Sequence, residues 1–214
     1  MKRLQFAAYL KPEYSECKID DAVIAADSAR VVARQESGEL MTVALFRGGH
    51  MLFLYCEAEG DARPEELLPS VSCLLETVPH DDGFTKWRSA VNLYHTFRPE
   101  ARRDLERGEA KTCVGRLAYL HRDKISSYAY YHKAIMDEGL YEGDKYLYIS
   151  LIDRLLFAYS EEPKIPWHIR IEENSPSLVI KEWVRQIPRD HFDRSRTGDS
   201  NFIGLDTLIA LPVC

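Results

Sequence analysis

The feature that most constrains the fold of this chain is a phrase that occurs twice. LFLYCEAE occupies residues 52–59 and LFAYSEEP occupies residues 156–163, with Leu, Phe, Tyr and Glu at matching positions. Two further landmarks recur in the same order: the tripeptide AYL at 8–10 and 118–120, and a tryptophan at positions 87 and 183. Three landmarks in one order predict an internal duplication, which has to be recognised before a fold is assigned.

Hydrophobic patterning predicts the same series of elements in each half. The first half has a strand at 3–10, a helix at 15–33, strands at 40–46 and 51–57, a helix over 64–76 that continues over 83–91, and a strand at 92–97. The second half has a strand at 114–120, a helix at 123–138, strands at 145–151 and 154–160, a helix at 175–187 and a strand at 203–211. The order β-α-β-β-α-β is that of the ferredoxin-like fold.

We therefore expect an α+β protein with two tandem ferredoxin-like repeats, over 1–97 and 113–214. Residues 98–112 are expected to form a charged linker that contains a short helix. The runs LMTVALF and LLFAY are apolar throughout, which is typical of strands buried on both faces. Two such sheets packed face to face would give, within one chain, the dimeric α/β barrel that single-repeat chains form as dimers. This arrangement permits a monomer and leaves a homodimer open.

Composition excludes several classes of function. The formal net charge of −6 offers no basic surface for nucleic acid or an anionic membrane. No run approaches the roughly 18 apolar residues of a membrane span, and the N-terminal apolar run is too short for a signal peptide. The five cysteines are scattered and show no CxxC spacing, which favours a reducing compartment over a disulfide framework or zinc site. The expected location is the cytoplasm.

The segment 126–150 concentrates the side chains suited to chemistry, with six tyrosines and one histidine. Tyr128 and His132 are four residues apart and share the helix face that apolar neighbours turn toward the sheet. Tyr146 and Tyr148 alternate on the next expected strand and share one of its faces. A histidine with nearby phenols can bind hydroxyl groups and move protons. Such a histidine is more often a core residue than a catalyst, so spacing alone leaves the function open.

The Tyr128-x-x-x-His132 pair, the tyrosine-rich strand and the run LLFA at 155–158 resemble the L-rhamnose mutarotase family. The resemblance covers about residues 111–214. Members of that family are cofactor-free enzymes of the dimeric α/β-barrel superfamily. The resemblance implies these site residues: His132 as proton donor, Tyr128 and either Tyr146 or Tyr148 as sugar contacts, and Trp183 as a wall of the pocket.

The resemblance implies that the protein is a mutarotase, an isomerase that interconverts the anomers of an aldose such as rhamnose. A small sugar would be its partner, and it would need no metal, nucleotide or redox cofactor. Acid–base catalysis of this kind contributes about 10²–10⁴-fold to the rate. Aligning the two halves at an offset of 110 places Lys18 opposite Tyr128 and Ala22 opposite His132. Since neither residue replaces the pair, we expect one site per chain, in the second half.

Two other functions fit the same residues. The same superfamily also contains small cofactor-free monooxygenases and haem-degrading proteins, and a duplicated chain can also become a non-catalytic sugar-binding module. Two segments have no counterpart in the expected repeat pattern. The first, 160–176, inserts Trp167 and His168, and the second is a charged loop at 189–199, which is either a lid or only a solvated loop.

Overall fold

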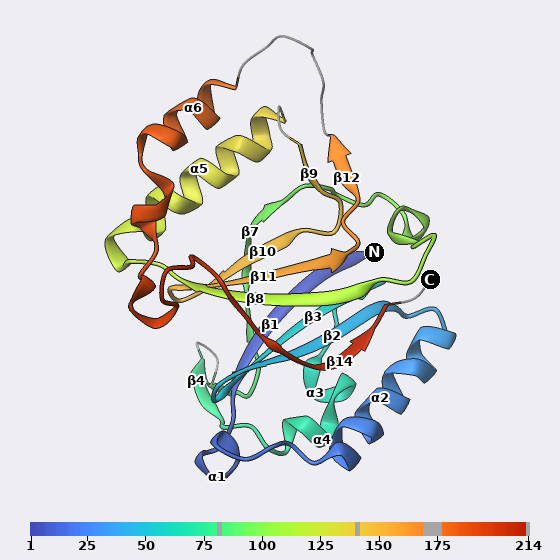
Figure 1. Cartoon of the computed structure of the whole chain (residues 1–214). Helices are drawn as coiled ribbons and strands as arrows, with labels where there is room; N and C mark the ends of the chain where they lie inside the picture. Colours follow the sequence, from blue (N-terminus) through green and yellow to red (C-terminus); the bar gives the residue numbers. More distant parts are fainter. Residues whose placement is uncertain (81–82, 140–141, 169–176, 213–214) are drawn as a thin grey trace. The chain divides into compact units, whose positions relative to one another are not determined.

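The computed structural model describes residues 1–80, 83–139, 142–168 and 177–212 (Figure 1). These residues form an α+β fold whose paired strands run antiparallel. They divide into two compact units, and neither unit is contiguous in the sequence. Unit 1 comprises Met1–Ala90, Pro99–Cys113 and Leu205–Cys214, and unit 2 comprises Val91–Arg98 and Val114–Gly204.

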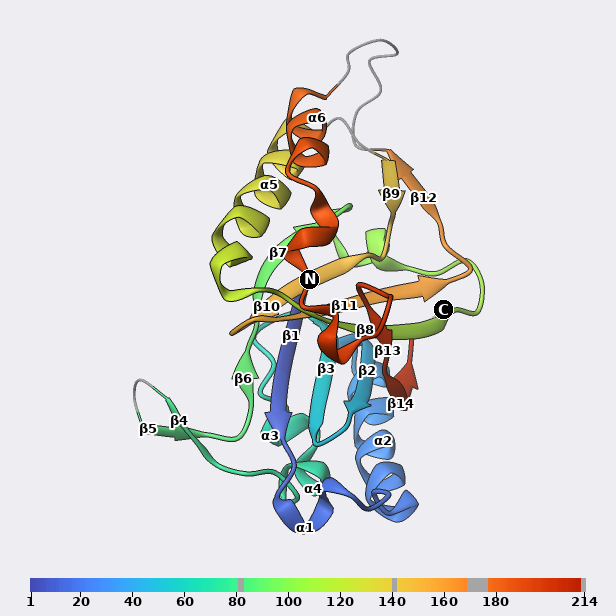
Figure 2. The same ribbon diagram turned by 60° about the vertical axis from the view of Figure 1, so that its left-hand side comes forward.

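Unit 1 contains a five-stranded sheet in the order β14-β2-β3-β1-β6. Its strands are β1 (Lys2–Tyr9), β2 (Leu40–Gly48), β3 (Met51–Ala58), β6 (Arg88–Ser89) and β14 (Asp206–Leu211). Its helices are α1 (Pro12–Ser15), α2 (Asp21–Glu36), α3 (Pro64–Leu67), α4 (Pro69–Ser72) and the 3-10 helix η1 (Arg102–Leu105). A separate hairpin consists of β4 (Val78–His80) and β5 (Gly83–Thr85). Helices α2, α3 and α4 cover one face of the sheet (Figures 1 and 2).

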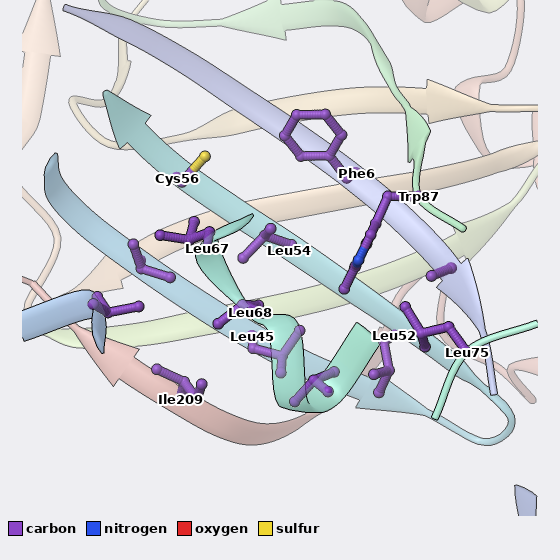
Figure 3. Packing of buried hydrophobic residues seen from close by; sticks show 14 of the residues in the cluster. Phe6, Leu45, Leu52, Leu54, Cys56, Leu67, Leu68, Leu75, Trp87 and Ile209 are labelled. Atoms are coloured by element: carbon purple, nitrogen blue, oxygen red, sulfur yellow. The ribbon is translucent and has the colours of Figure 1, made fainter. Parts of the chain in front are cut away.

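The apolar core of unit 1 lies between this face and the helices. Alternate residues of β3, namely Leu52, Leu54 and Cys56, point into it and are fully buried. Figure 3 shows them packed together with Trp87, which is 4% exposed. The Trp87 indole N–H donates to the hydroxyl of Ser72 at 2.9 Å, so its one polar atom is also satisfied. Burying each large apolar side chain stabilises the fold by about 1.5–3 kcal/mol.

The opposite face of β3 carries a buried polar network. The Tyr55 hydroxyl donates to the Glu57 carboxylate at 2.7 Å, and Arg3 Nε donates to the same hydroxyl at 2.9 Å. Arg107 donates to both Glu57 oxygens, at 2.9 and 3.0 Å. This bidentate geometry offsets the cost of burying two charges. Arg107 lies in the expected linker 98–112, of which residues 99–112 belong to unit 1.

Unit 2 contains a second five-stranded sheet in the order β13-β8-β11-β10-β7. Its strands are β7 (Val91–His95), β8 (Thr112–Tyr119), β10 (Tyr148–Ile152), β11 (Leu155–Glu162) and β13 (Ile203–Gly204). Its helices are α5 (Ile125–Glu138), α6 (Leu178–Arg185) and the 3-10 helices η2 (Arg122–Lys124), η3 (Pro188–His191) and η4 (Arg194–Arg196). A small two-stranded sheet pairs β9 (Glu142–Asp144) with β12 (Pro166–His168).

The repeated phrase forms the same hydrogen bond in both units. In β11 the Tyr159 hydroxyl donates to Glu161 at 2.6 Å, and both residues are fully buried. This contact matches the one between Tyr55 and Glu57 in β3. The Tyr-x-Glu spacing places both side chains on one face of the strand, where each supplies the partner of the other.

The strand that ends each half of the sequence pairs within the other unit. Strand β7 pairs with β10, and β14 pairs with β2. Each pairing contains one register shift, at Ile149/Ser150 and at Thr207/Ile209. The expected repeat boundaries at 97 and 113 therefore do not coincide with the boundaries of the compact units. The reason is that the sequence of a strand does not predict which other strand it pairs with.

The second helix expected in the first half is wrong over most of its length. Only the short α3 and α4 form within 64–76, and the range expected to be helical at 83–91 contains β5, β6 and the start of β7. Pro69 disfavours helical backbone at Leu68 and ends α3 after one turn. Gly83 then takes a φ of 133°, which no helix contains. Trp87 consequently lies in the core without belonging to a helix.

Most other expected elements are present with shifted ends. Helix α2 begins at Asp21, later than expected, because the Asp20 side chain caps it by accepting from the Ala22 N–H at 2.8 Å. Residues 169–176 of the expected insertion, and the start of the expected helix at 175, lie outside the described residues. Within the described residues, no helix combines the length and apolar character needed to cross a membrane.

Candidate functional site

Helix α5 directs the Tyr128–His132 pair toward the sheet of unit 2. Tyr128 and Ile135 are the buried residues of this helix, 2% and 7% exposed. Tyr128 packs in one cluster with apolar side chains of β8, β10 and β11. The helix ends at Gly139, whose φ of 67° allows its N–H to bond to the Ile135 carbonyl. The sequence-based orientation of this face is therefore correct for Tyr128.

Helix α6 packs beside α5 and carries Trp183 (Figures 1 and 2). The Ser177 hydroxyl caps α6 by accepting from the Ile180 N–H at 2.8 Å. The same hydroxyl donates to Glu138 at the end of α5, and the Leu178 N–H donates to that carboxylate at 3.2 Å. These contacts fix the start of α6 against the end of α5.

Tyr128, His132 and Trp183 meet in one aromatic cluster, as the sequence predicts. The Tyr128 and His132 rings stack with centroids 3.8 Å apart. The Trp183 indole meets both rings edge-on, at 5.1 Å from His132 and 5.8 Å from Tyr128. His132 Nδ1 lies 2.9 Å from the Tyr128 carbonyl, so Nδ1 carries the proton and donates it. Nε2 of the neutral ring is therefore a proton acceptor, and it makes no hydrogen bond to the described residues.

Tyr94 is a member of the cluster that sequence reasoning missed. It lies on β7, and its ring meets the His132 ring edge-on at 5.4 Å. The sequence assigns Tyr94 to the last strand of the first half, far from the second-half site. Only the pairing of β7 with β10 brings it to His132. The sequence around Tyr94 does not predict which strand β7 pairs with.

His191 is a second missed member, and it lies in the segment 189–199 expected to be a charged loop. It is 2% exposed, its ring centroid lies 4.6 Å from that of Trp183, and its Nε2 lies 2.8 Å from the Ser127 hydroxyl. A β-bridge between Leu120 and Phe192 holds this segment against the end of β8. The apolar neighbour Phe192, 7% exposed, is the one sequence signal for a buried segment here.

Burial sets the protonation states of the cluster. Removal from water lowers the pKa of His132 to about 4, against a smaller opposing effect of the Tyr128 carbonyl. At pH 7 the His132 side chain is therefore neutral. Burial also raises the pKa of Tyr128 well above its usual range, with the nearby Tyr94 adding to the effect. The cluster is thus neutral across the physiological range, which suits a planar apolar ligand with a hydroxyl for Nε2.

The two tyrosines expected on the strand after α5 do not join the cluster. Tyr146 lies in a turn before β10 and is fully buried, with the Lys145 ammonium 5.4 Å from its ring centroid. Tyr148 starts β10 and stacks on His95 at 6.0 Å. Its neighbour Ile149 packs in the cluster around Tyr128, so strand alternation directs Tyr148 to the other face of the sheet.

The residues aligned with the pair in the first half also need correction. Lys18 precedes α2 and Ala22 lies in its first turn, so the helices do not keep the offset of 110. Helices α2 and α5 begin at residues 21 and 125, an offset of 125 − 21 = 104, which is also the offset of the repeated phrase. The residues that then stand opposite Tyr128 and His132 are Ile24 and Ser28.

Among the described residues, no group of three or more histidine, cysteine, aspartate and glutamate side chains could hold a metal ion. His50, His80 and His95 thus belong to no such group. His95 instead bonds Asn92, with its Nδ1 2.8 Å from the amide oxygen, and His50 stacks on Tyr9 at 5.7 Å.

Comparison with known proteins gives a likeness in structure only. No family model matches the chain, and no curated protein matches it in sequence. A "putative monooxygenase" from Fusobacterium nucleatum subsp. nucleatum is 9% identical, with a TM-score of 0.44, over 98% of this chain and 93% of that chain. Another from Lactobacillus acidophilus NCFM is 6% identical, with a TM-score of 0.41, over 99% of this chain and 97% of that chain.

The expected mutarotase function is corrected. Both structural neighbours are named as monooxygenases, which are oxidoreductases, and neither is named as a sugar isomerase. The isomerase class and rhamnose as the substrate are withdrawn with it. The site gives an independent physical reason. The expected mutarotase mechanism used His132 as the proton donor, whereas an imidazole with a pKa of about 4 is uncharged near neutral pH and its one N–H donates to the Tyr128 carbonyl.

Proposed function

We propose that unit 2 carries the site of a monooxygenase-type oxidoreductase that binds a planar aromatic substrate with an acidic hydroxyl. The observation that carries the proposal is the neutral imidazole of His132 among the rings of Tyr94, Tyr128 and Trp183. Aromatic walls favour a flat apolar ligand. The unbonded Nε2 supplies one directional contact for a hydroxyl. The five site residues in this proposal are Tyr94, Tyr128, His132, Trp183 and His191.

In the proposed reaction His132 Nε2 accepts the hydrogen bond and then the proton of the substrate hydroxyl. Deprotonation raises the electron density at an adjacent CH₂ carbon, which O₂ then oxidises. One oxygen atom replaces the two hydrogens to give C=O, and the other leaves with them as water. The substrate supplies all four electrons, and His132 returns its proton. Because His132 is a weak base, the substrate hydroxyl has to be more acidic than a simple phenol.

The low basicity of His132 favours a second candidate, a ligand-binding module without turnover. A buried neutral imidazole accepts a hydrogen bond at any pH above about 5. One accepted hydrogen bond of this kind is sufficient to orient a bound ligand. The ligand class would be the same, since the walls and the acceptor are the same.

We propose further that the chain is an internal duplication whose two sheets form an intrachain dimeric α/β barrel. A matching hydrogen bond at the end of the first strand in each half supports this proposal. The N–H of Leu10 bonds to the His50 carbonyl at 2.9 Å, and the N–H of Leu120 bonds to the Arg154 carbonyl at 2.8 Å. His50 and Arg154 both occupy the turn of the hairpin that follows. Under this proposal, the resemblance of residues 111–214 to a mutarotase family reflects common descent within the dimeric α/β-barrel superfamily. It does not indicate a shared activity.

The function is tested by oxygen consumption with a panel of hydroxyanthrones, which combine an acidic phenol with a CH₂ carbon. We expect one O₂ per substrate and one ¹⁸O atom in the product when ¹⁸O₂ is supplied. His132→Gln should lower kcat/KM by at least about 100-fold, in line with loss of a general base. The matched control is His121→Gln, an exposed histidine of unit 2, which should keep full activity.

Tight binding of panel members without O₂ consumption would support the binding module instead. Neither binding nor consumption across the panel, in a folded protein, would contradict both candidates.

A further inference from the structure

His191 connects the first turn of α5 to the Trp183 wall of the cluster. Its ring packs on Trp183 with centroids 4.6 Å apart and an interplanar angle of 59°. It also lies 6.4 Å from the Tyr128 ring. On the other side it reaches Ser127 of α5, one residue before Tyr128. The segment that carries it is tied to β8, because the Asp193 N–H donates to the Tyr119 carbonyl at 2.8 Å.

One hydrogen bond ties the His191 ring to helix α5. The Ser127 hydroxyl donates its single proton to the Lys124 carbonyl at 3.1 Å. The same hydroxyl is hydrogen-bonded to His191 Nε2, 2.8 Å away. Nδ1 is buried and makes no well-formed hydrogen bond to the described residues, although the Ile187 and Pro188 carbonyls act on the ring. The bond to Ser127 is therefore the best-formed polar contact that orients the His191 ring.

We propose that His191 is the positioning residue of the unit 2 site. The chain of contacts Ser127–His191–Trp183 holds the indole edge-on to His132 and so fixes the wall against which the ligand lies. His191 acts through Trp183 and does not itself touch the ligand, since it is 2% exposed. The prediction for substrate affinity rests on the proposed function, whereas the prediction for the orientation of Trp183 does not.

The surroundings keep His191 uncharged in this task. Burial lowers its pKa, and the nearby Lys124 adds to the effect. The carbonyls of Ile187 and Pro188 and the Asp190 carboxylate oppose it. The coulombic interaction between His191 and His132 likewise favours a state in which both rings are neutral. A neutral His191 can pack on Trp183 and bond Ser127 without placing a charge in the aromatic cluster.

The test labels the tryptophans with 5-fluorotryptophan and records ¹⁹F NMR spectra without substrate. Of the three signals, that of Trp183 is assigned by its loss in Trp183→Phe. Ser127→Ala and His191→Phe should shift or broaden the Trp183 signal and leave those of Trp87 and Trp167 unchanged. Ser127→Thr, which restores the hydroxyl, should restore the signal. The matched control is Ser126→Ala, an exposed serine one residue earlier on α5, which should change none of the three.

With an active substrate, both variants should raise KM about 5–10-fold and change kcat less than twofold. An unchanged Trp183 signal in folded Ser127→Ala and His191→Phe would overturn the proposal. If His191→Phe fails to fold, Ser127→Ala alone decides. If no substrate is turned over by the unmodified protein, the proposed function fails, but the ¹⁹F spectra still decide whether His191 positions Trp183.

Discussion

His132 illustrates how strongly packing changes the chemistry of one residue. The four-residue spacing from Tyr128 correctly indicates an inward-facing histidine, and the sequence suggests a proton donor. The stacked Tyr128 ring and the edge of Trp183 instead cover much of the imidazole, and this desolvation holds it neutral. The desolvation that lowers its pKa depends on what covers the ring, which the spacing does not record.

The lowered pKa of His132 makes the stability of the fold depend on pH. Its folded-state pKa of about 4 lies below the ordinary value of 6.5, so between these values the unfolded chain binds a proton that the folded chain does not. The stabilising effect is present above pH 6.5 and is lost as pH falls toward 4. Urea unfolding at pH 7.5 and pH 5 should therefore show a larger loss of stability in the unmodified protein than in His132→Gln. Equal losses in the two proteins would contradict the neutral assignment.

At the scale of the element, strand β7 decides the composition of the site. Its sequence is typical of a strand, but its partner β10 lies in the other half of the sequence. Asn92 stabilises the irregular part of this pairing: its side-chain amide donates to the Ile149 carbonyl at 3.0 Å and to the Tyr94 carbonyl at 3.2 Å. At the register shift next to Ile149, the Asn92 side chain thus supplies a hydrogen-bond donor to backbone carbonyl groups.

Asn92→Ala should destabilise the protein by about 1–2 kcal/mol, because two backbone carbonyls lose a donor in a partly buried place. The same change should loosen Tyr94 against His132. Urea denaturation measures the first effect. Asn201→Ala is the control, since the Asn201 side chain makes no hydrogen bond to the described residues, and it should change stability by less than about 0.5 kcal/mol. Equal effects of the two substitutions would argue against a special part for Asn92.

At the scale of the whole chain, the exchange of β7 and β14 makes each unit depend on both halves of the sequence. Unit 1 takes residues 205–214 from the second half, and unit 2 takes residues 91–98 from the first. A half chain alone therefore lacks one edge strand of its own sheet and leaves the backbone of β2 or β10 unpaired. Exposed unpaired edges favour aggregation.

Fragments 1–109 and 110–214, divided in an exposed loop, should each aggregate or stay unfolded when produced alone. Produced together, they should form a 1:1 complex with the circular dichroism of the intact chain. Size-exclusion chromatography separates these outcomes. A stable folded monomer from either fragment alone would show that the exchanged strands are dispensable.

The sequence by itself determined the elements whose information is local. Short apolar runs indicated the strands, the spacing of Tyr128 and His132 indicated a shared helix face, and the Tyr-x-Glu of the repeated phrase forms the same hydrogen bond in both sheets. Trp183 falls on the expected helix. Such features depend on residues within about four positions of each other, so periodicity suffices to predict them.

The tertiary structure alone decided which strands pair and which side chains meet. Tyr94 and His191 join His132 from segments distant in sequence, whereas Tyr148, close in sequence, faces the other side of its strand. Pairing β7 with β10 is favoured by the free energy of the whole folded sheet, summed over many weak contacts. This free energy depends on residues from many segments. The pairing of β7 with β10 therefore cannot be predicted from the sequence of either strand alone.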